Sequence, residues 1–529
     1  MLATASTQSC AVTRSAFTGI SAYRIVTHMA SQHTKITAAV ACLLLGILAV
    51  LLLTVPTEDL YEPPDYMYGI VLDAGSSHTT LYIYKWPADK QNGTGIVTQH
   101  SECHVKGGGI SSYAGLDGGA AGSLQACLDD AVRDIPKARH ELTPVYLGAT
   151  AGMRLLNISS PRGTERILRE VSHKIRSYPF NFQGATILSG KEEGAYGWVT
   201  VNYLQENFIK YGFVGRWLSP GKDTVGALDL GGASTQITFL TRDVVESREN
   251  SITLRLYGHN YALYTHSFLC YGRDQVLRRL LALLVESQGS SGTVSHPCLP
   301  ADHSVSMVMG EVFDSPCTAQ FRPDPYDPRA PLTVQGSGQY QQCLDLVMDL
   351  FTFDRCSFSQ CSFDQVFQPN VSGSFMAFSA FFYVHSFLKL STGISVSTPA
   401  MMEQAARSVC GMTFQEMLAI APDQKKRLQD YCATSVFVQV ILLQGYRFDK
   451  VSLPRVSFQS KAGGTSIGWA LGYMLSLTSL LPTESLAVRK ALHPGAWGAL
   501  IFLCALPIIA ALYLFMRMSR QKSQGGSSI

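Results

Sequence analysis

The 529-residue sequence lacks the short signatures of several common functional classes. It contains no Cys-x2-Cys pair and no His-Glu-x-x-His, the spacings typical of structural zinc sites and of zinc proteases. The closest cysteines, Cys356 and Cys361, have no partnering histidines. No basic patch or nucleic-acid-binding motif stands out, and the formal net charge is only +3. These absences argue against a cysteine-ligated zinc site, a zinc protease and a nucleic-acid-binding protein.

Charged residues are also scarce, at 15% of the chain, whereas hydrophobic residues make up 46%. A chain of this length and composition can bury a large core, and it should form more than one domain. The composition therefore predicts a folded, multidomain protein and excludes a disordered one.

Two long uncharged runs lie near the ends of the chain. Residues 36–55 and 496–516 number 20 and 21, and each run is long enough to cross a membrane as a helix. Lys35 precedes the first run, acidic residues follow it, and three basic residues lie in 517–529. Because basic flanks belong in the cytoplasm, we predict two transmembrane helices, cytoplasmic tails at 1–35 and 517–529, and an extracellular part between the helices.

The first 35 residues permit more than one interpretation. They are acid-free and rich in Ser and Thr, like a transit peptide, whereas a cleaved signal peptide is disfavoured by the length of the apolar run and the absence of a clear cleavage site. Residues 29–35 already supply a short basic tail, so we predict that residues 1–28 are dispensable. Whether they belong to the working protein stays open.

Two short, similar stretches stand out, each at a turn between two strand-like segments. Glycines allow a sharp turn and close approach to a ligand, successive N–H groups with hydroxyls form an anion nest, and a leading acid can hold a cation. One such turn is usually an ordinary connection, whereas two copies indicate an internal duplication that faces a shared cleft for a metal-bound polyphosphate. The turns are Asp73-Ala-Gly-Ser-Ser77, between 69–72 and 79–84, and Asp229-Leu-Gly-Gly-Ala-Ser-Thr235, between 225–228 and 235–239.

Three further segments complete a set of five that occur in a fixed order. They are Gly148-Ala-Thr-Ala-Gly-Met-Arg154, Ser189-Gly-Lys-Glu-Glu-Gly-Ala-Tyr-Gly-Trp198 and Gly468-Trp-Ala-Leu-Gly-Tyr-Met-Leu475. With these segments the chain resembles the ectonucleoside triphosphate diphosphohydrolases, a family of membrane-bound apyrases. The resemblance covers nearly everything between the two apolar runs. Among the cell-surface members the chain looks most like the eighth type.

The resemblance implies an α/β fold with two lobes of the actin and sugar-kinase type and a nucleotide cleft between them. Lobe I would comprise residues 64–189 and 460–492, and lobe II residues 190–459. The proline-bearing acidic segment before lobe I reads as a linker. Within lobe II, the apolar and aromatic stretch 375–388 is too short for a membrane span, and we predict a buried core helix there.

The implied reaction is stepwise hydrolysis of extracellular nucleoside triphosphates and diphosphates to the monophosphate and phosphate. It would depend on Ca²⁺ or Mg²⁺ and would control extracellular nucleotide (purinergic) signalling at the plasma membrane. A phosphotransferase of the same superfamily and a non-catalytic nucleotide-binding receptor are the alternatives. The sequence leaves open the preference between ATP and ADP, the preferred metal, the tissue, and whether the chain forms a homo-oligomer.

The acidic pair Glu192-Glu193 sits at the start of a predicted helix. Such a pair is often only a favourable arrangement with the helix macrodipole. The resemblance instead makes Glu193 the general base and leaves Glu192 as a neighbour that tolerates change. By the same resemblance, Ser234 and Gln236 help to hold the attacking water.

The remaining implied roles concern the cation and the phosphates. Asp73 and Asp229 would hold the cation through its waters, since hard divalent cations take oxygen ligands. Trp469 would border the hydration shell, although a plain core role fits its apolar motif equally well. The phosphates would be wrapped by hydroxyls, one imidazole and backbone N–H groups, from Ser76, Ser77, His78, Thr150, Gly231, Gly232, Ala233 and Ser234.

An aromatic ring and an arginine sandwich the nucleobase in this family, and Tyr383 and Arg427 are the nearest matches. The alternative interpretation places Tyr383 in the core and Arg427 in a solvated cluster with Lys425 and Lys426. Stacking tolerates any base, because every base offers a π face. We therefore predict that both ATP and UTP are substrates.

The cysteine count suits an oxidising compartment. Of 13 cysteines, Cys10 falls in the N-terminal tail and Cys42 and Cys504 fall in the apolar runs, which leaves an even ten between the runs. The acceptor sequences at Asn92, Asn157 and Asn370 agree with glycosylation in that compartment. The resemblance implies the pairs Cys103–Cys127, Cys270–Cys317, Cys298–Cys343, Cys356–Cys361 and Cys410–Cys432.

Overall fold

The computed structural model describes residues 34–51, 66–88, 90, 92–212, 217–221, 223–289, 292–481 and 494–524. These residues fall into two compact units, one formed by the two ends of the chain and the other by Pro64–Glu484. The predicted N-terminal tail before residue 34, the linker 56–64 and Cys10 lie outside the described residues.

The unit formed by the two ends contains two long helices, Thr34–Leu51 and α15 (Pro494–Gln524). Both are long and apolar enough to cross a membrane, and both expose large apolar side chains along their length. Gly46 of the first helix faces Ile508 of α15, because a Cβ added at Gly46 would lie 3.1 Å from that side chain. The described parts of the two apolar runs, residues 36–51 and 496–516, are therefore helical.

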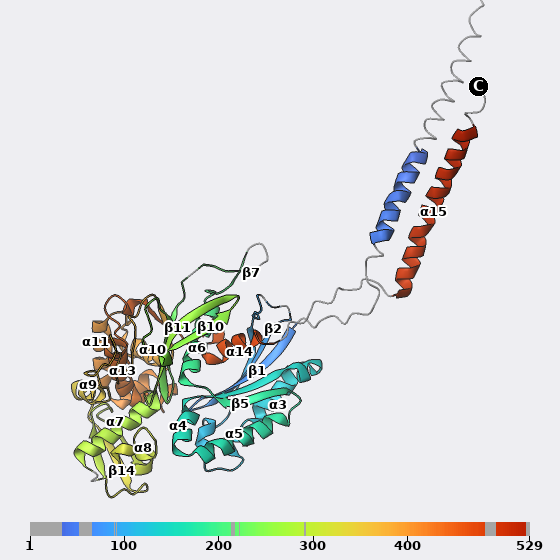
Figure 1. Ribbon diagram of the computed structural model, residues 1–529. Helices are drawn as coiled ribbons and strands as arrows, with labels where there is room; N and C mark the ends of the chain where they lie inside the picture. The colour runs from blue at the N-terminus through green and yellow to red at the C-terminus, as the bar shows by residue number, and fades with distance from the viewer. Residues whose placement is uncertain are drawn as a thin grey trace, which may run out of the picture. The chain divides into compact units, whose positions relative to one another are not determined.

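The first sheet of the larger unit has five strands in the order β3-β2-β1-β4-β5 (Figure 1). Strands β1 and β2 form an antiparallel hairpin, and β4 joins β1 in parallel. Its core is made by apolar runs such as Ile70–Leu72, in which every side chain is fully buried. Helices α3, α4 and α5 accompany it; α5 begins where the Ser160 hydroxyl accepts a hydrogen bond from the Gly163 N–H and a proline follows. The bounds are β1 Tyr66–Ala74, β2 Thr79–Pro87, β3 Thr98–His104, β4 Pro144–Ala149, β5 Asn181–Ile187, α2 Gly119–Ser123, α3 Gln125–Asp134, α4 Ala151–Ser159 and α5 Pro161–Arg176.

The second sheet has six strands in the order β10-β11-β9-β8-β15-β16. It repeats the motif of the first, since β8 and β9 form an antiparallel hairpin and β15 joins β8 in parallel. The repeat agrees with the internal duplication read from the two turns. Its bounds are β8 Gly226–Leu230, β9 Ser234–Leu240, β10 Ser251–Leu256, β11 His259–Leu269, β15 Phe375–Ser379 and β16 Val456–Phe458.

The rest of the larger unit, as far as the structure describes it, is mainly helical and includes three small sheets. The helices are α6 Gly190–Leu204, α7 Arg273–Gln288, α8 Met309–Phe313, α9 Tyr340–Met348, α10 Ala380–Thr392, α11 Pro399–Cys410, α12 Phe414–Ile420, α13 Tyr431–Val440 and α14 Trp469–Thr478. The remaining strands are β6 Lys210–Tyr211, β7 Trp217–Leu218, β12 Thr293–His296, β13 Ser304–Val308, β14 Pro331–Gly336, β17 Lys461–Ala462 and β18 Thr465–Ser466.

Helices α6 and α14 pack tightly against each other, with α14 also contacting β1 and β2 of the first sheet (Figure 1). The Gly472 N–H donates to the Thr200 hydroxyl at 2.8 Å, and a Cβ at Gly472 would overlap the Tyr196 carbonyl. Because α6 also contacts β9 and β11, this helix pair joins the two sheets. The C-terminal segment thus returns to the first sheet, while the exact lobe boundaries stay a prediction.

The prediction of one core helix over 375–388 is wrong in its first third. Phe375–Ser379 forms strand β15, which pairs with β8 and β16, and only then does α10 begin. A short apolar run that is buried on both faces looks the same in sequence whether it is strand or helix. Ser379, with a φ of 56°, makes the break between the two elements.

The larger unit contains five disulfides, and their pairs are those that the resemblance implies. Cys42 and Cys504, in the two long helices, carry free thiols. The bonds are Cys103–Cys127, Cys270–Cys317, Cys298–Cys343, Cys356–Cys361 and Cys410–Cys432.

Candidate active site

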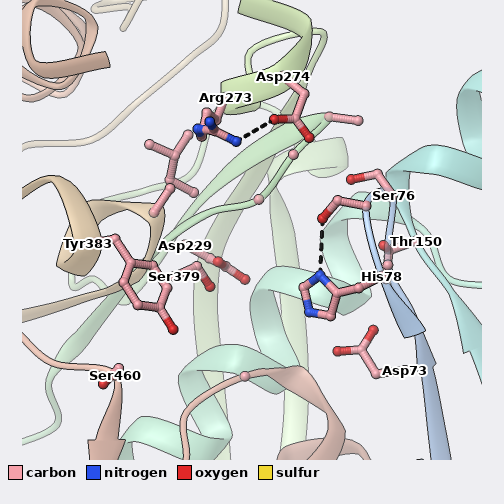
Figure 2. A pocket seen from close by; sticks show the side chains of 18 of the residues that line it. Asp73, Ser76, His78, Thr150, Asp229, Arg273, Asp274, Ser379, Tyr383 and Ser460 are labelled. Carbon is pink, nitrogen blue, oxygen red and sulfur yellow. Dashed lines mark hydrogen bonds and ion pairs between the residues drawn. The ribbon is translucent and has the colours of Figure 1, made fainter. Parts of the chain in front are cut away.

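The two hairpin turns meet at one cleft, with a cavity volume of about 380 Å³. Asp73 and the turn after β1 line one wall, and Asp229 and the turn after β8 line the other (Figure 2). Because the two hairpins occupy equivalent places in their sheets, the cleft is where the duplicated motifs face each other. The lining includes all of the predicted site residues except Gln236: Asp73, Ser76, Ser77, His78, Thr150, Glu193, Asp229, Gly231, Gly232, Ala233, Ser234, Tyr383, Arg427 and Trp469.

Three carboxyl groups lie at the base of this cleft: Glu193 is buried, and Asp73 and Asp229 are half-buried. Burial raises the pKa of Asp73 to about 8, and the neighbouring charge of Glu193 adds to the rise. Burial likewise raises the pKa of Glu193 to about 7 and that of Asp229 to about 6. Within the described chain, Asp229 Oδ1 has no hydrogen-bond partner although it is buried. A group of carboxyl oxygens that repel one another fits a hard divalent cation, for which Asp73 and Asp229 would supply oxygen ligands.

The two adjacent glutamates at the start of α6, Glu192 and Glu193, have different surroundings. The Ser189 hydroxyl accepts from the Glu192 N–H, while the Ser189 N–H and hydroxyl both donate to Glu192 Oε2, at 2.9 and 2.8 Å. This capping box uses the Glu192 carboxylate to begin the helix. Glu193, one residue on, is only 8% exposed and lines the cleft. Local helix chemistry therefore accounts for Glu192 and leaves Glu193 for the site.

Arg154, at the end of the second sequence motif, pairs with Glu193. Its Nη2 lies 2.5 Å from Glu193 Oε2 and donates to the Ser234 hydroxyl at 3.1 Å. The positive charge lowers the Glu193 pKa against the rise that burial causes. Sequence reasoning gave Arg154 no role, although its position in a Gly-rich motif was a signal that it approaches the cleft.

Gln236 lies behind Ser234 and outside the described lining of the cleft. Its Nε2 donates to the Ser234 hydroxyl at 2.7 Å. Its Oε1 is buried and has no hydrogen-bond partner among the described residues. The structure thus brings Glu193, Ser234 and Gln236 into one hydrogen-bonded cluster, with Arg154 at its centre.

The second turn is supported by the N-terminus of α7. The N–H groups of Arg273 and Asp274 donate to the carbonyls of Gly231 and Gly232, at 2.9 and 2.8 Å. A Cβ at Gly232 would lie 2.6 Å from Ser76 Oγ and 2.7 Å from Asp274 Oδ2. The two hairpin turns therefore approach each other closely here, and a larger residue would displace the Ser76 or Asp274 side chain.

The first turn is supported by two other segments. The Thr150 N–H donates to the Ala74 carbonyl at 3.1 Å, which brings the 148–154 motif against the turn. A Cβ at Gly109 would overlap the Gly75 carbonyl, so the segment Gly107-Gly-Gly109 also packs on this turn. His78 bonds the Ser77 hydroxyl through Nδ1 at 3.0 Å. Burial, together with positive neighbours, lowers the pKa of His78 and favours a neutral imidazole.

The Arg427 guanidinium lies 5.8 Å from the centroid of the Tyr383 ring at the outer part of the cleft. Tyr383 is 50% exposed, which excludes the alternative that it is a core residue. Arg273 also lines the cleft and bonds Asp274 at 2.8 Å (Figure 2). It bonds Asp430 as well, at 2.5 Å. Sequence reasoning missed Arg273, Asp274 and Asp430, because they form no motif and Asp430 comes from a separate element.

Trp469 opens α14 and is 3% exposed, with its ring against Gly148. A Cβ at Gly148 would overlap the ring, so the glycine of the second motif makes room for the tryptophan of the fifth. Burial raises the pKa of the Asp73 carboxyl, and a hydrogen bond from the Trp469 side chain opposes that rise. Trp469 is therefore a buried core residue that also lines the cleft.

Comparison with known proteins agrees with this arrangement. Residues 60–491 match the GDA1/CD39 (nucleoside phosphatase) family. The chain belongs to this family. It is 53% identical over 472 residues to ectonucleoside triphosphate diphosphohydrolase 2 of Homo sapiens, which covers 89% of this chain and 94% of the relative. It is 43% identical over 480 residues to ectonucleoside triphosphate diphosphohydrolase 8 of Gallus gallus, which covers 90% and 96%.

The family membership confirms the predicted enzyme class. The predicted likeness to the eighth type is wrong, because the second-type relative shares 53% of its residues with this chain and the eighth-type relative shares 43%. Among solved structures, the nucleoside triphosphate hydrolases from Neospora caninum superpose with a TM-score of 0.57 at 17% identity, over 79% of this chain and 93% of theirs. That likeness confirms the two-lobed α/β fold.

Proposed function

We propose that this chain hydrolyses extracellular nucleoside triphosphates and diphosphates to the monophosphate and phosphate, with Ca²⁺ or Mg²⁺ as cofactor. The observation that carries the proposal is the cluster of three carboxyl groups with raised pKa values, Asp73, Glu193 and Asp229, between the two hairpin turns. Removal of extracellular nucleotides would end the signals that they carry. The names of the relatives support the choice of substrate.

Four residues have separate roles in the proposed transfer of the phosphoryl group to water. Ser234 and Gln236 hold the attacking water, and Glu193 orients it and accepts its proton at a carboxylate oxygen. Arg154 keeps the Glu193 carboxylate in place through their ion pair. The burial that raises the Glu193 pKa to about 7 makes this carboxylate a better proton acceptor near neutral pH than an ordinary glutamate.

The nucleotide is held at two places. The turns at Ser76–His78 and Gly231–Ser234, with Thr150, surround the phosphates with hydroxyls and N–H groups. A cation anchored by Asp73 and Asp229, with Trp469 beside its hydration shell, would neutralise charge on the phosphate oxygens. Tyr383 and Arg427 enclose the base by stacking, which admits both purines and pyrimidines.

The site acts outside the cell in this proposal. The two apolar helices anchor the chain in the plasma membrane with both termini in the cytoplasm, as the basic flanks indicate. Asn92, Asn157 and Asn370 are all exposed, as glycosylation requires. The five disulfides agree with the same oxidising environment.

A phosphate-release assay on intact cells that express the full chain tests the proposal. We expect release from ATP, ADP and UTP with Ca²⁺ or Mg²⁺, and loss of release with a chelator. A phosphotransferase would need an added acceptor, and a receptor would bind nucleotide without releasing phosphate. Either result would contradict the proposed hydrolysis.

A further inference from the structure

Ser267 on β11 lies directly opposite Gln236 on β9. The next pair on the same face of these two strands, two residues along, is Thr265 opposite Thr238, whose hydroxyls bond each other at 2.7 Å. Because side chains alternate along a strand, Gln236 and Thr238 share a face of the sheet with their partners. Polar side chains therefore form a short row on this face, beside the cleft.

Helix α6, which carries Glu193, lies on this polar row. A Cβ at Gly190 would overlap both the Ser267 side chain and the Arg154 guanidinium. A Cβ at Gly194 would lie 2.6 Å from the Thr238 hydroxyl and 2.7 Å from the Thr265 hydroxyl. The two glycines, one helical turn apart, let the helix settle on the row and bring Glu193 to the cluster.

Gln236, Ser234, Arg154 and Ser267 are joined by hydrogen bonds into a closed ring. Gln236 Nε2 donates to Ser234 Oγ at 2.7 Å and to Ser267 Oγ at 3.0 Å. Arg154 donates to the same two hydroxyl oxygens, at 3.1 and 3.4 Å. Ser267 therefore bridges the arginine that holds Glu193 and the glutamine that supports Ser234.

The ring uses both donors of the Gln236 amide. An amide group has two N–H donors and one carbonyl acceptor, and the two serines take both donors. The carbonyl, Gln236 Oε1, is the buried atom without a partner in the part of the chain that the structure describes. Without Ser267, one N–H would lose its acceptor and the amide could rotate.

We propose that Ser267 is a positioning residue for hydrolysis, which fixes the Gln236 amide so that Oε1 is the atom offered to the attacking water. The proposal rests on the proposed function above. A water molecule that attacks phosphorus has two protons to place. Glu193 accepts one, and the carbonyl of a correctly oriented Gln236 accepts a hydrogen bond from the other.

Ser267→Ala tests this role. Loss of one neutral hydrogen bond should lower kcat for ATP and ADP by about 3- to 10-fold. KM should stay within about 2-fold, because no nucleotide group is lost and only the orientation of the water changes. A raised KM with unchanged kcat would overturn the proposal.

Thr265→Val is the matched control. It removes a fully buried hydroxyl two residues away on the same strand and the same face. Thermal stability should fall, whereas kcat should remain at the wild-type value. If this variant lost kcat as Ser267→Ala does, general disturbance of the sheet would explain both effects and the specific role would fail.

A double-mutant cycle separates this proposal from the function on which it rests. In a Gln236→Ala background, Ser267→Ala should lower kcat by less than about 2-fold, because the residue through which it acts is absent. An equal reduction in both backgrounds would overturn the role of Ser267 alone. If Gln236→Ala itself hydrolysed ATP at the wild-type rate, the proposed role of Gln236 would fail as well.

Discussion

The two hairpins place different residues at equivalent positions. Asp73 pairs across its hairpin with Thr80, and Asp229 pairs across its own with Gln236. On the next strand outward, Thr80 pairs with His104 through a 3.0 Å hydrogen bond, and Gln236 pairs with Ser267. The acid is the same in both lobes, whereas the residue opposite it has diverged.

This difference indicates that the two hairpins acquired different functions after duplication. Both acids can anchor a cation at the base of the cleft. The residues proposed to hold the attacking water, Ser234 and Gln236, lie on the second hairpin, and Arg154 ties Glu193 of α6 to Ser234. The first hairpin instead offers Ser76, Ser77 and a neutral His78, groups suited to binding phosphate.

The largest effect should come from Glu193. Glu193→Gln keeps the shape of the side chain but removes the proton acceptor, so kcat for ATP and ADP should fall by about 10²-fold or more. Glu192→Gln is the matched control, since its carboxylate serves the capping box and its loss should cost only some helix stability. Steady-state phosphate release from both variants measures the contrast. Equal losses would rule out Glu193 as the base.

The second effect tests the comparison of the hairpins directly. Gln236→Ala should lower kcat by about 10-fold or more, whereas Thr80→Ala, at the equivalent position, should change it by less than about 3-fold. The same assay, run on purified full-length protein, gives both values. Similar losses in the two variants would mean that the hairpins share the water-holding role.

The third effect concerns the outer part of the cleft. Loss of base stacking in Tyr383→Ala should raise KM for ATP and UTP alike, by about 5- to 50-fold, with little change in kcat. Tyr66→Ala, which removes an exposed tyrosine at the start of β1 and outside the cleft lining, is the control. An unchanged KM in a folded Tyr383→Ala protein would show that the base binds elsewhere.

The smallest effect is on stability. A carboxyl whose pKa is raised on folding favours the folded state while it is protonated, and this contribution is lost as pH rises through the folded pKa. The pKa values near 8, 7 and 6 of Asp73, Glu193 and Asp229 therefore predict that the Tm of chelator-treated protein falls by a few degrees from about pH 5 to about pH 8. Ca²⁺ or Mg²⁺ should raise Tm more at the higher pH. A Tm that does not change with pH would contradict the burial of these carboxyl groups.

The sequence predicted the parts of the site that local patterns encode. The strands at 69–72 and 225–228 and the acids that follow them could be read directly, because apolar runs and glycine turns are local signals. The strand Phe375–Ser379 could not, since an apolar run buried on both faces has no distinguishing period. The role of Ser267 could not be predicted from the sequence, because its pairing with Gln236, 31 residues away, depends on the register of the two strands.

The ion pair between Arg273 and Asp430 in the outer part of the cleft could not be predicted from the sequence either. Arg273 and Asp430 are 157 residues apart, and each is an ordinary charged residue in its own segment. Only the packing of separate elements brings them together. Arg154 is an intermediate case, since its motif indicated an approach to the cleft but not its ion pair with Glu193.

Hydrolysis in ¹⁸O-labelled water tests the central claim most directly. With ATP and Mg²⁺ or Ca²⁺, attack by water at phosphorus should place one ¹⁸O atom in each phosphate released and none in the nucleotide monophosphate. Mass spectrometry of the products distinguishes these positions. Label in the nucleotide, or no phosphate release until an acceptor alcohol is added, would contradict the account of a cleft built to activate water.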